Sequence, residues 1–176
     1  MFEEVFGIPA HPLVVHAAVV FIPLQILAAL GYAFIPPVRR FIAWLVVALA
    51  VAGPLAALFA RLSGTAFEAR LIRNGKAGPP LLQKIAEHYS YATNTLYFSI
   101  GLGVLMLALV GVQVMRSRNA VVAGDAGGEQ SETASAKGPI VVAAVITVAV
   151  VAVGAFTGYY IFKTGDTGAH MVWTGY

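Results

Sequence analysis

Residues 139–162 read PIVVAAVITVAVVAVGAFTGYYIF and contain no Asp, Glu, Lys or Arg. A helix rises about 1.5 Å per residue, so about 20 residues cross a hydrocarbon core of roughly 30 Å. This stretch is therefore long enough to span a bilayer, and three more stretches meet the same criterion. The sequence predicts an all-α integral membrane protein, a four-transmembrane-helix bundle with spans at about 12–36, 41–62, 84–115 and 139–162.

The composition favours the same class of protein. Of 176 residues, 59% are hydrophobic and only 11% are charged, and the mean hydropathy is +0.82. So few charged side chains cannot cover a water-soluble protein of this size. Because the chain has no cysteine, disulfides, thiolate metal sites and iron–sulfur ligation are excluded. The net charge of +3 is too small for a nucleic-acid-binding surface.

The whole chain, residues 1–176, is expected to form a single membrane domain. Pro23 and Pro54 lie inside the first two spans, and the carbonyl that each frees must find a partner within the bundle. Residues 63–87 contain a short amphipathic piece that we expect at the membrane interface. Residues 119–138, rich in Gly, Ala, Ser and Glu, have the composition of a linker.

The histidines carry the functional information. In the predicted topology His11, His16, His88 and His170 all fall on one face of the membrane. His16 and His88 lie at similar depth on the first and third spans, which is the arrangement that a b-type haem between two helices needs. Neutral imidazole binds haem iron, copper or zinc. We therefore expect His16 and His88 to bind haem b or a transition metal, with His11 and His170 as further candidate metal ligands.

His11 lies about 140° around a regular helix from His16, so both rings cannot bind one ion, and His11 is expected as a helix-start residue. The alternative is that His16 and His88 are structural, each donating one N–H to a backbone carbonyl or to Tyr91, Asn94 or Gln25. No serine triad, phosphate loop, H-E-x-x-H helix or paired carboxylate occurs. The sequence thus predicts a protein that is not an enzyme on its own.

The tail after the last span offers two interpretations. Gly165 and Gly168 permit a tight turn, after which the tail could cap the histidines, with Asp166 orienting an imidazole. Alternatively, Trp173 and Tyr176 anchor it at the level of the lipid headgroups.

Two motifs resemble an uncharacterised family of predicted bacterial membrane proteins of actinobacterial type, a domain of unknown function. They are H-P-x-x-x-H at residues 11–16 and G-D-x-G-A-x-x-x-W at residues 165–173. The resemblance covers nearly the whole chain and carries over His11, His16 and His88 as family positions, whereas His170 falls at a variable position. Related domains are fused to Rieske-type iron–sulfur domains, which implies a redox or respiratory setting and the bacterial inner membrane.

Orientation rests on the basic residues. Arg39, Arg40, Arg116 and Arg118 abut helix ends, whereas the N-terminus carries only acids. Lys and Arg gather on the cytoplasmic side of membrane proteins, so we expect a multi-pass protein of the cytoplasmic membrane with both termini outside.

Two hypotheses follow. The first is a haem b or metal-binding protein of respiratory electron transfer. The second is a non-catalytic accessory subunit of a larger, respiratory membrane complex, which would pack Gly154-x-x-x-Gly158 against partner subunits. Beyond the lipid bilayer and such subunits no partner is expected, and nucleic acid is excluded. A transporter is disfavoured because no charged side chain lies in a span.

Overall fold

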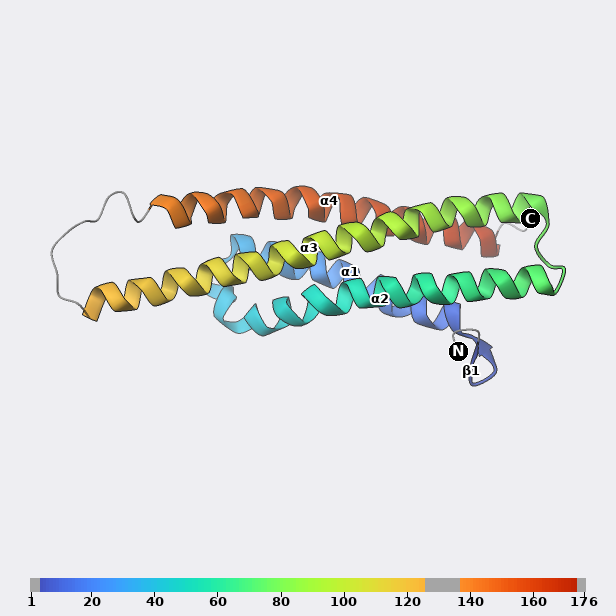
Figure 1. Cartoon of the computed structure of the whole chain (residues 1–176), viewed down its shortest axis with the longest axis horizontal. Helices are drawn as coiled ribbons and strands as arrows, with labels where there is room; N and C mark the ends of the chain where they lie inside the picture. The colour runs from blue at the N-terminus through green and yellow to red at the C-terminus, as the bar shows by residue number, and fades with distance from the viewer. Residues whose placement is uncertain (1–3, 126–136, 174–176) are drawn as a thin grey trace.

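The computed structural model describes residues 4–125 and 137–173 as a bundle of long helices packed side by side (Figure 1). The helices are α1 (Ala10–Phe34), α2 (Arg39–Arg73), α3 (Pro79–Asp125) and α4 (Lys137–Trp173). A short 3-10 helix, η1 (Pro36–Val38), joins α1 to α2, and the antiparallel strands β1 (Glu4–Val5) and β2 (Ile8–Pro9) precede α1. All four helices are long and apolar enough to cross a membrane. The predicted fold class is confirmed.

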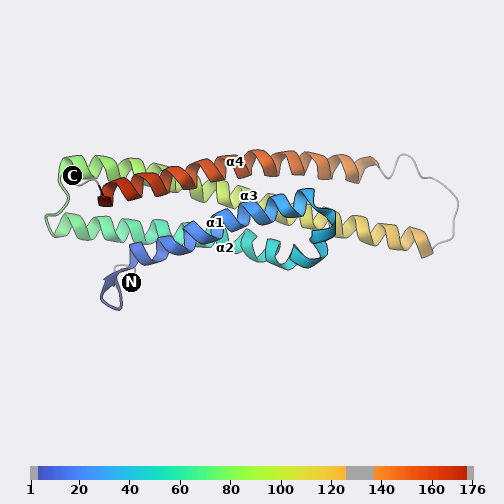
Figure 2. The ribbon, with the colours of Figure 1, turned by 180° about the vertical axis from the view of Figure 1, so that it is seen from behind.

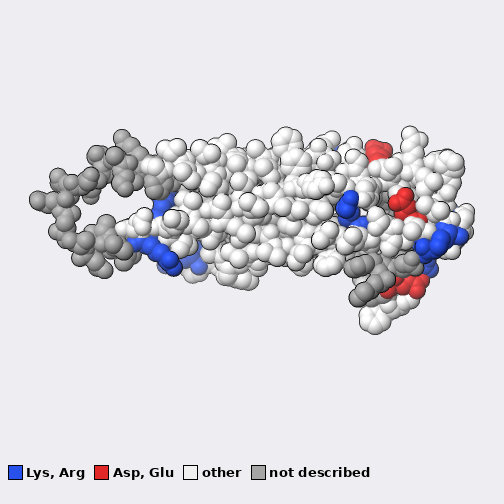
Figure 3. All heavy atoms as spheres, viewed as in Figure 1, with Lys and Arg blue, Asp and Glu red and all other residues white. Residues whose placement is uncertain are grey.

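The bundle consists of two helical hairpins that run the same way. α1 packs along α2 and α3 packs along α4, and both hairpins begin and end at the same end of the molecule (Figures 1 and 2). All four histidines belong to the helix turns at that end, which we call the histidine end. Arg39, Arg40, Arg116 and Arg118 lie at the opposite end, which we call the arginine end. On the face shown in Figure 3, the charged side chains visible at the arginine end are all Lys or Arg. Both basic and acidic side chains are visible at the histidine end.

Three expected boundaries are wrong. α2 continues to Arg73, so the amphipathic piece beyond residue 62 extends a spanning helix instead of lying along the interface. α4 continues through Gly165 and Gly168 to Trp173, so the predicted glycine turn does not form. α3 reaches Asp125, and the rest of the expected linker, 126–136, lies outside the described residues. For α2 and α4, packing around a shared cavity outweighs the local signals for a helix end.

A polar contact ties α1 to α3 in the middle of the bundle. The Gln25 amide donates to the Ser99 carbonyl at 3.0 Å, and the Ser99 hydroxyl donates to Gln25 Oε1 at 2.8 Å. Both side chains are fully buried. A Cβ at Gly53 would overlap the Gln25 amide, so glycine makes room for this contact.

The proline of α2 is accommodated by a second glycine. Pro54 cannot donate to the carbonyl of Ala50, one turn earlier, and that carbonyl faces Gly103 of α3 so closely that a Cβ at 103 would overlap it. Only glycine lets the backbones of α2 and α3 approach at this point. The freed carbonyl is therefore covered by the Gly103 backbone inside the bundle.

The two halves of the bundle differ in their buried side chains. Toward the arginine end the core is apolar and contains Val46, Leu102, Met106, Leu109 and Val150. Toward the histidine end, the buried polar residues Ser63 and Thr95 accompany the smaller apolar cluster around Ile22 and Leu96. Polar chemistry is thus concentrated in one half.

Candidate functional site

A cavity of about 610 Å³ opens between the four helices at the histidine end. This volume falls in the range of cofactor and small-molecule sites. Most of its wall is apolar, and its polar lining comprises His11, His16, Arg61, Glu68, His88, Tyr89, Thr95 and Thr164. The cavity is the place where ring nitrogens from different helices can meet a common ligand.

The ring of His11 is held by α2. Its Nδ1 lies 3.1 Å from the Ala60 carbonyl and 3.1 Å from the Ser63 hydroxyl. Because Ser63 donates its own hydrogen to the Ala60 carbonyl at 2.9 Å, its oxygen accepts from His11. Gly64 faces the ring, and a Cβ there would lie 3.2 Å from His11 Cε1. We call Ala60, Ser63 and Gly64 the α2 histidine site.

The ring of His88 is held in the same way by α4. Its Nδ1 lies 3.0 Å from the Thr167 hydroxyl, which donates its hydrogen to the Lys163 carbonyl at 2.8 Å. The Thr164 carbonyl also interacts with the ring. A Cβ at Gly168 would lie 3.2 Å from His88 Cε1. We call Thr164, Thr167 and Gly168 the α4 histidine site.

The two sites share one spacing. In each, a carbonyl comes first, a hydroxyl follows three residues later, and a glycine follows the hydroxyl directly. Residues at these positions lie on one face of a helix, so one face of α2 and one of α4 present the same groups to an imidazole. The two hairpins therefore each contribute one oriented histidine.

The rings of His11 and His88 lie close together in a nearly perpendicular arrangement. Their centroids are 6.4 Å apart and their planes make an angle of 85°. Ligand bonds of about 2 Å put two nitrogens on one ion about 4 Å apart, and each ring centre lies about 1 Å behind its nitrogen. The centroid separation is thus compatible with one ion between the rings.

The other two histidines are held differently. His16 also lines the cavity, but its exposed ring contacts a carbonyl of its own helix, with Nδ1 2.6 Å from Pro12 O. His170 is exposed, with Nδ1 2.9 Å from the Asp166 carbonyl and 3.3 Å from Oδ1 of the same residue. Asp166 therefore orients His170 and not a ring in the cavity.

The residues after the last predicted span have features of both interpretations of the tail, the cap over the histidines and the anchor at the lipid headgroups. Within α4, Ala169, Met171, Val172 and Trp173 line the cavity, and Trp173 is 84% exposed, while Tyr176 lies outside the described residues. The tail closes one side of the cavity as a helix, without folding back.

Sequence reasoning paired His88 with His16, whereas the structure brings His11 to His88. The structural interpretation offered a backbone carbonyl as a partner, and His16 contacts the Pro12 carbonyl. Among the described residues, Tyr91, Asn94 and Gln25 form no hydrogen bond with His16 or His88. The signal that could have found the pair is the spacing shared by ARLSG at 60–64 and TGDTG at 164–168.

The described residues contain no group of three or more His, Cys, Asp or Glu side chains that could hold a metal ion. A bare ion at His11 and His88 would have two protein ligands, fewer than the three or four of zinc sites. Haem iron needs only two axial ligands. The donor set therefore fits haem better than a bare ion.

The small-residue motif of α4 is used within the chain. A Cβ at Gly154 or at Gly158 would lie 3.8 Å from the Ile26 side chain of α1. These glycines therefore pack against α1 within the chain.

The fold and the spans define a four-helix integral membrane protein. The chain belongs to the DUF2231 family of predicted membrane proteins, a domain of unknown function whose model matches residues 7–175. No curated protein and no solved structure matches the chain.

Proposed function

We propose that this protein is a membrane-bound b-type haem protein of respiratory electron transfer, in which His11 and His88 would hold the haem. The observation that carries the proposal is the pair of matching histidine sites, which bring two rings from different hairpins to a centroid separation of 6.4 Å. A structural histidine needs one hydrogen-bond partner but no facing imidazole and no adjoining cavity.

The hydrogen bonds assign the tautomers that ligation requires. Nδ1 of His11 faces a carbonyl, and Nδ1 of His88 faces a hydroxyl whose hydrogen is already donated. Each Nδ1 therefore carries the hydrogen, and each neutral ring keeps a lone pair on Nε2. Metal-binding histidines are held in this manner, with the second nitrogen donating to the protein.

The wall of the cavity suits a large, mostly apolar ligand with a charged edge. Phe67 of α2 lies stacked 6.2 Å from the His11 ring, and Leu71 and Ile161 add apolar surface. Arg61 is the one Lys or Arg in the described lining, and its Nε donates to Thr93 at 3.2 Å. Its remaining N–H groups can meet a ligand carboxylate. Bound haem would supply one-electron transfer.

The respiratory setting and the orientation extend the proposal. The resemblance to domains that occur fused to Rieske-type proteins favours a redox partner. We propose that the arginine end lies in the cytoplasm, which the four arginines there support, and that the histidine end and both termini lie outside. Because the chain has no cysteine, single cysteines introduced at Gly75 and Ser117 and labelled in intact cells would test this: only the former should react.

The decisive test is the absorbance spectrum of the purified chain after expression with ample haem supply. We expect a Soret band that is lost in His11→Ala and in His88→Ala and retained in His170→Ala. His16→Ala separates the two possible pairs, because the pair expected from the sequence requires its band to disappear. A colourless, haem-free preparation of correctly folded protein would overturn the proposal.

A second spectroscopic readout distinguishes one histidine ligand from two. Haem held by both His11 and His88 would give a low-spin EPR signal. A high-spin signal would mean that only one ring binds.

The accessory subunit without chemistry remains the alternative outcome of these tests. It predicts a colourless protein that co-purifies with a larger complex. Since Gly154 and Gly158 contact Ile26 within the chain, its partner surface would have to lie elsewhere.

A further inference from the structure

A second cavity, of about 630 Å³, lies at the arginine end. Its lining residues come from the corner of α1, η1 and α2 and from the side of α3. α3 extends beyond that corner (Figures 1 and 2). Its lining includes Tyr32, Arg39, Arg40, Ala43, Gln113 and Val114. The cavity is separated from the histidines by the apolar core and plays no part in the proposed haem site.

Arg39 builds the wall of this cavity. Its Nε donates to the Tyr32 carbonyl at 2.8 Å and its Nη2 donates to the Ala33 carbonyl at 2.7 Å. These carbonyls belong to the last turn of α1, where backbone acceptors lack helical partners. Arg39 thereby holds the corner together and places the exposed Arg40 beside it.

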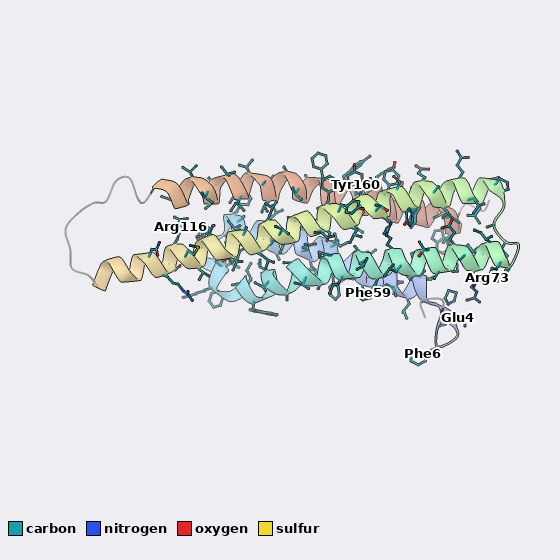
Figure 4. The ribbon with its side chains drawn as sticks, in the orientation of Figure 1. Glu4, Phe6, Phe59, Arg73, Arg116 and Tyr160 are labelled. Carbon is teal, nitrogen blue, oxygen red and sulfur yellow. The ribbon has the colours of Figure 1, made fainter. Side chains whose placement is uncertain are left out.

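The described lining of this cavity contains Arg39 and Arg40 and no Asp or Glu. No Asp or Glu occurs between Glu4 and Glu68, or between Glu87 and Asp125. Arg116 lies on α3 at this end (Figure 4). A cavity lined by two arginines and an amide therefore attracts an anion.

The depth of the cavity indicates which anion it meets. Trp44 lies one turn of α2 after Arg40 and is 71% exposed. Exposed tryptophans of membrane helices lie at the level of the lipid headgroups, so the arginines lie where lipid phosphates are.

We propose that the arginine-end cavity binds the phosphate of an anionic phospholipid. The Arg40 guanidinium and the Gln113 amide supply the donors, and Ala43 and Val114 supply apolar surface for the start of the acyl chains. Basic pockets between membrane helices bind anionic headgroups in this way. A zwitterionic lipid would bring its own cation toward Arg39 and Arg40, which disfavours it.

Fluorescence quenching tests this proposal with the full chain. Trp44 and Trp173 are the two tryptophans, so Trp173→Phe leaves Trp44 as the single reporter. The variant is placed in phosphatidylcholine vesicles that contain brominated phosphatidylglycerol or, in the matched sample, brominated phosphatidylcholine. We expect stronger quenching by the anionic lipid, equivalent to about fivefold preferential binding.

Two further variants and one competition complete the test. Arg40→Gln should abolish the preference, whereas Arg118→Gln, at the same end but outside the cavity lining, should retain it. Retained preference in inorganic phosphate supports a lipid site. Equal quenching by both lipids overturns the proposal. A preference that inorganic phosphate removes, but that sodium chloride of equal ionic strength leaves in place, also overturns it, because that result would identify a site for free phosphate.

Discussion

The α2 and α4 histidine sites hold equivalent rings in different surroundings. The α2 site lies in the middle of the chain, its Ser63 is fully buried, and Phe67 stacks against its ring. The α4 site lies in the last turns of α4, is half-buried, and adjoins an ion-pair group of Lys163, Asp166 and His170. What recurs in both is the carbonyl, the hydroxyl and the glycine.

Comparing the two sites distinguishes the groups that hold the imidazole from the groups that differ because each site lies at a different place in the bundle. An acceptor on Nδ1 fixes the ring and its tautomer, and a glycine lets the ring approach the helix. Those features are present twice, whereas the aromatic contact and the ion pairs are each present once. Substitutions in the recurring features should therefore affect the two sites alike, and substitutions in the others should not.

The largest effect is expected when the glycines are filled. Gly64→Leu and Gly168→Leu place a side chain where the Cβ alone would lie 3.2 Å from a histidine Cε1, so each should displace its ring. We expect haem binding to weaken by about 100-fold, the upper range for residues that support a ligand. Haem titration monitored at the Soret band measures this.

The matched control is Gly111→Leu, because no atom lies within 4 Å of a Cβ at that position of α3. It should bind haem as the unmodified chain does. Unchanged binding in both Gly64→Leu and Gly168→Leu would show that the rings are not held against these helices.

A smaller effect, similar at the two sites, is expected from the hydroxyls. Thr167→Val removes the side-chain acceptor of His88 and should weaken haem binding by about tenfold. Ser63→Ala should weaken it by a similar factor, because a backbone carbonyl, of Ala60 or of Thr164, remains beside each ring. Haem titration of the two variants measures both losses, and a large loss in only one of them would show that the two hydroxyls are not equivalent.

The spans followed from the sequence because hydrophobic length decides them, whereas the helix ends did not. The signals for stops at residue 62 and at Gly165 were local, and α2 and α4 continue beyond both because their ends pack around the cavity. A glycine in a helix weakens the prediction of a helix, yet Gly168 is there to admit a ring from another hairpin.

The pairing of His11 with His88 could not be predicted from the sequence, because it too depends on how the helices pack. Helical azimuth shows that His11 and His16 point in different directions, but it does not show which direction faces α3. That depends on how α1 packs against α2, which brings the His11 ring onto Ala60 and Ser63. The shared spacing in α2 and α4 gains its meaning only when the hairpins lie side by side.

The smallest effects should come from the ion pairs, which differ between the sites. Glu4 of β1 contacts Arg70 of α2 at 2.6 Å, so this pair ties the segment before His11 to the helix of its site. Asp166 pairs within α4, at 3.7 Å from Lys163 Nζ and 3.3 Å from His170 Nδ1. All these groups are partly exposed, so each pair contributes at most about 1 kcal/mol.

Arg70→Gln should therefore lower the midpoint of thermal unfolding slightly, and the difference from the unmodified chain should vanish at high salt, where exposed charges are screened. Asp166→Asn should change it even less, because the bonds of α4 itself hold that helix together. If Arg70→Gln instead weakened haem binding as much as Thr167→Val does, the strand segment before His11 would be part of the α2 histidine site. The two sites would then resemble one another only in their helical residues.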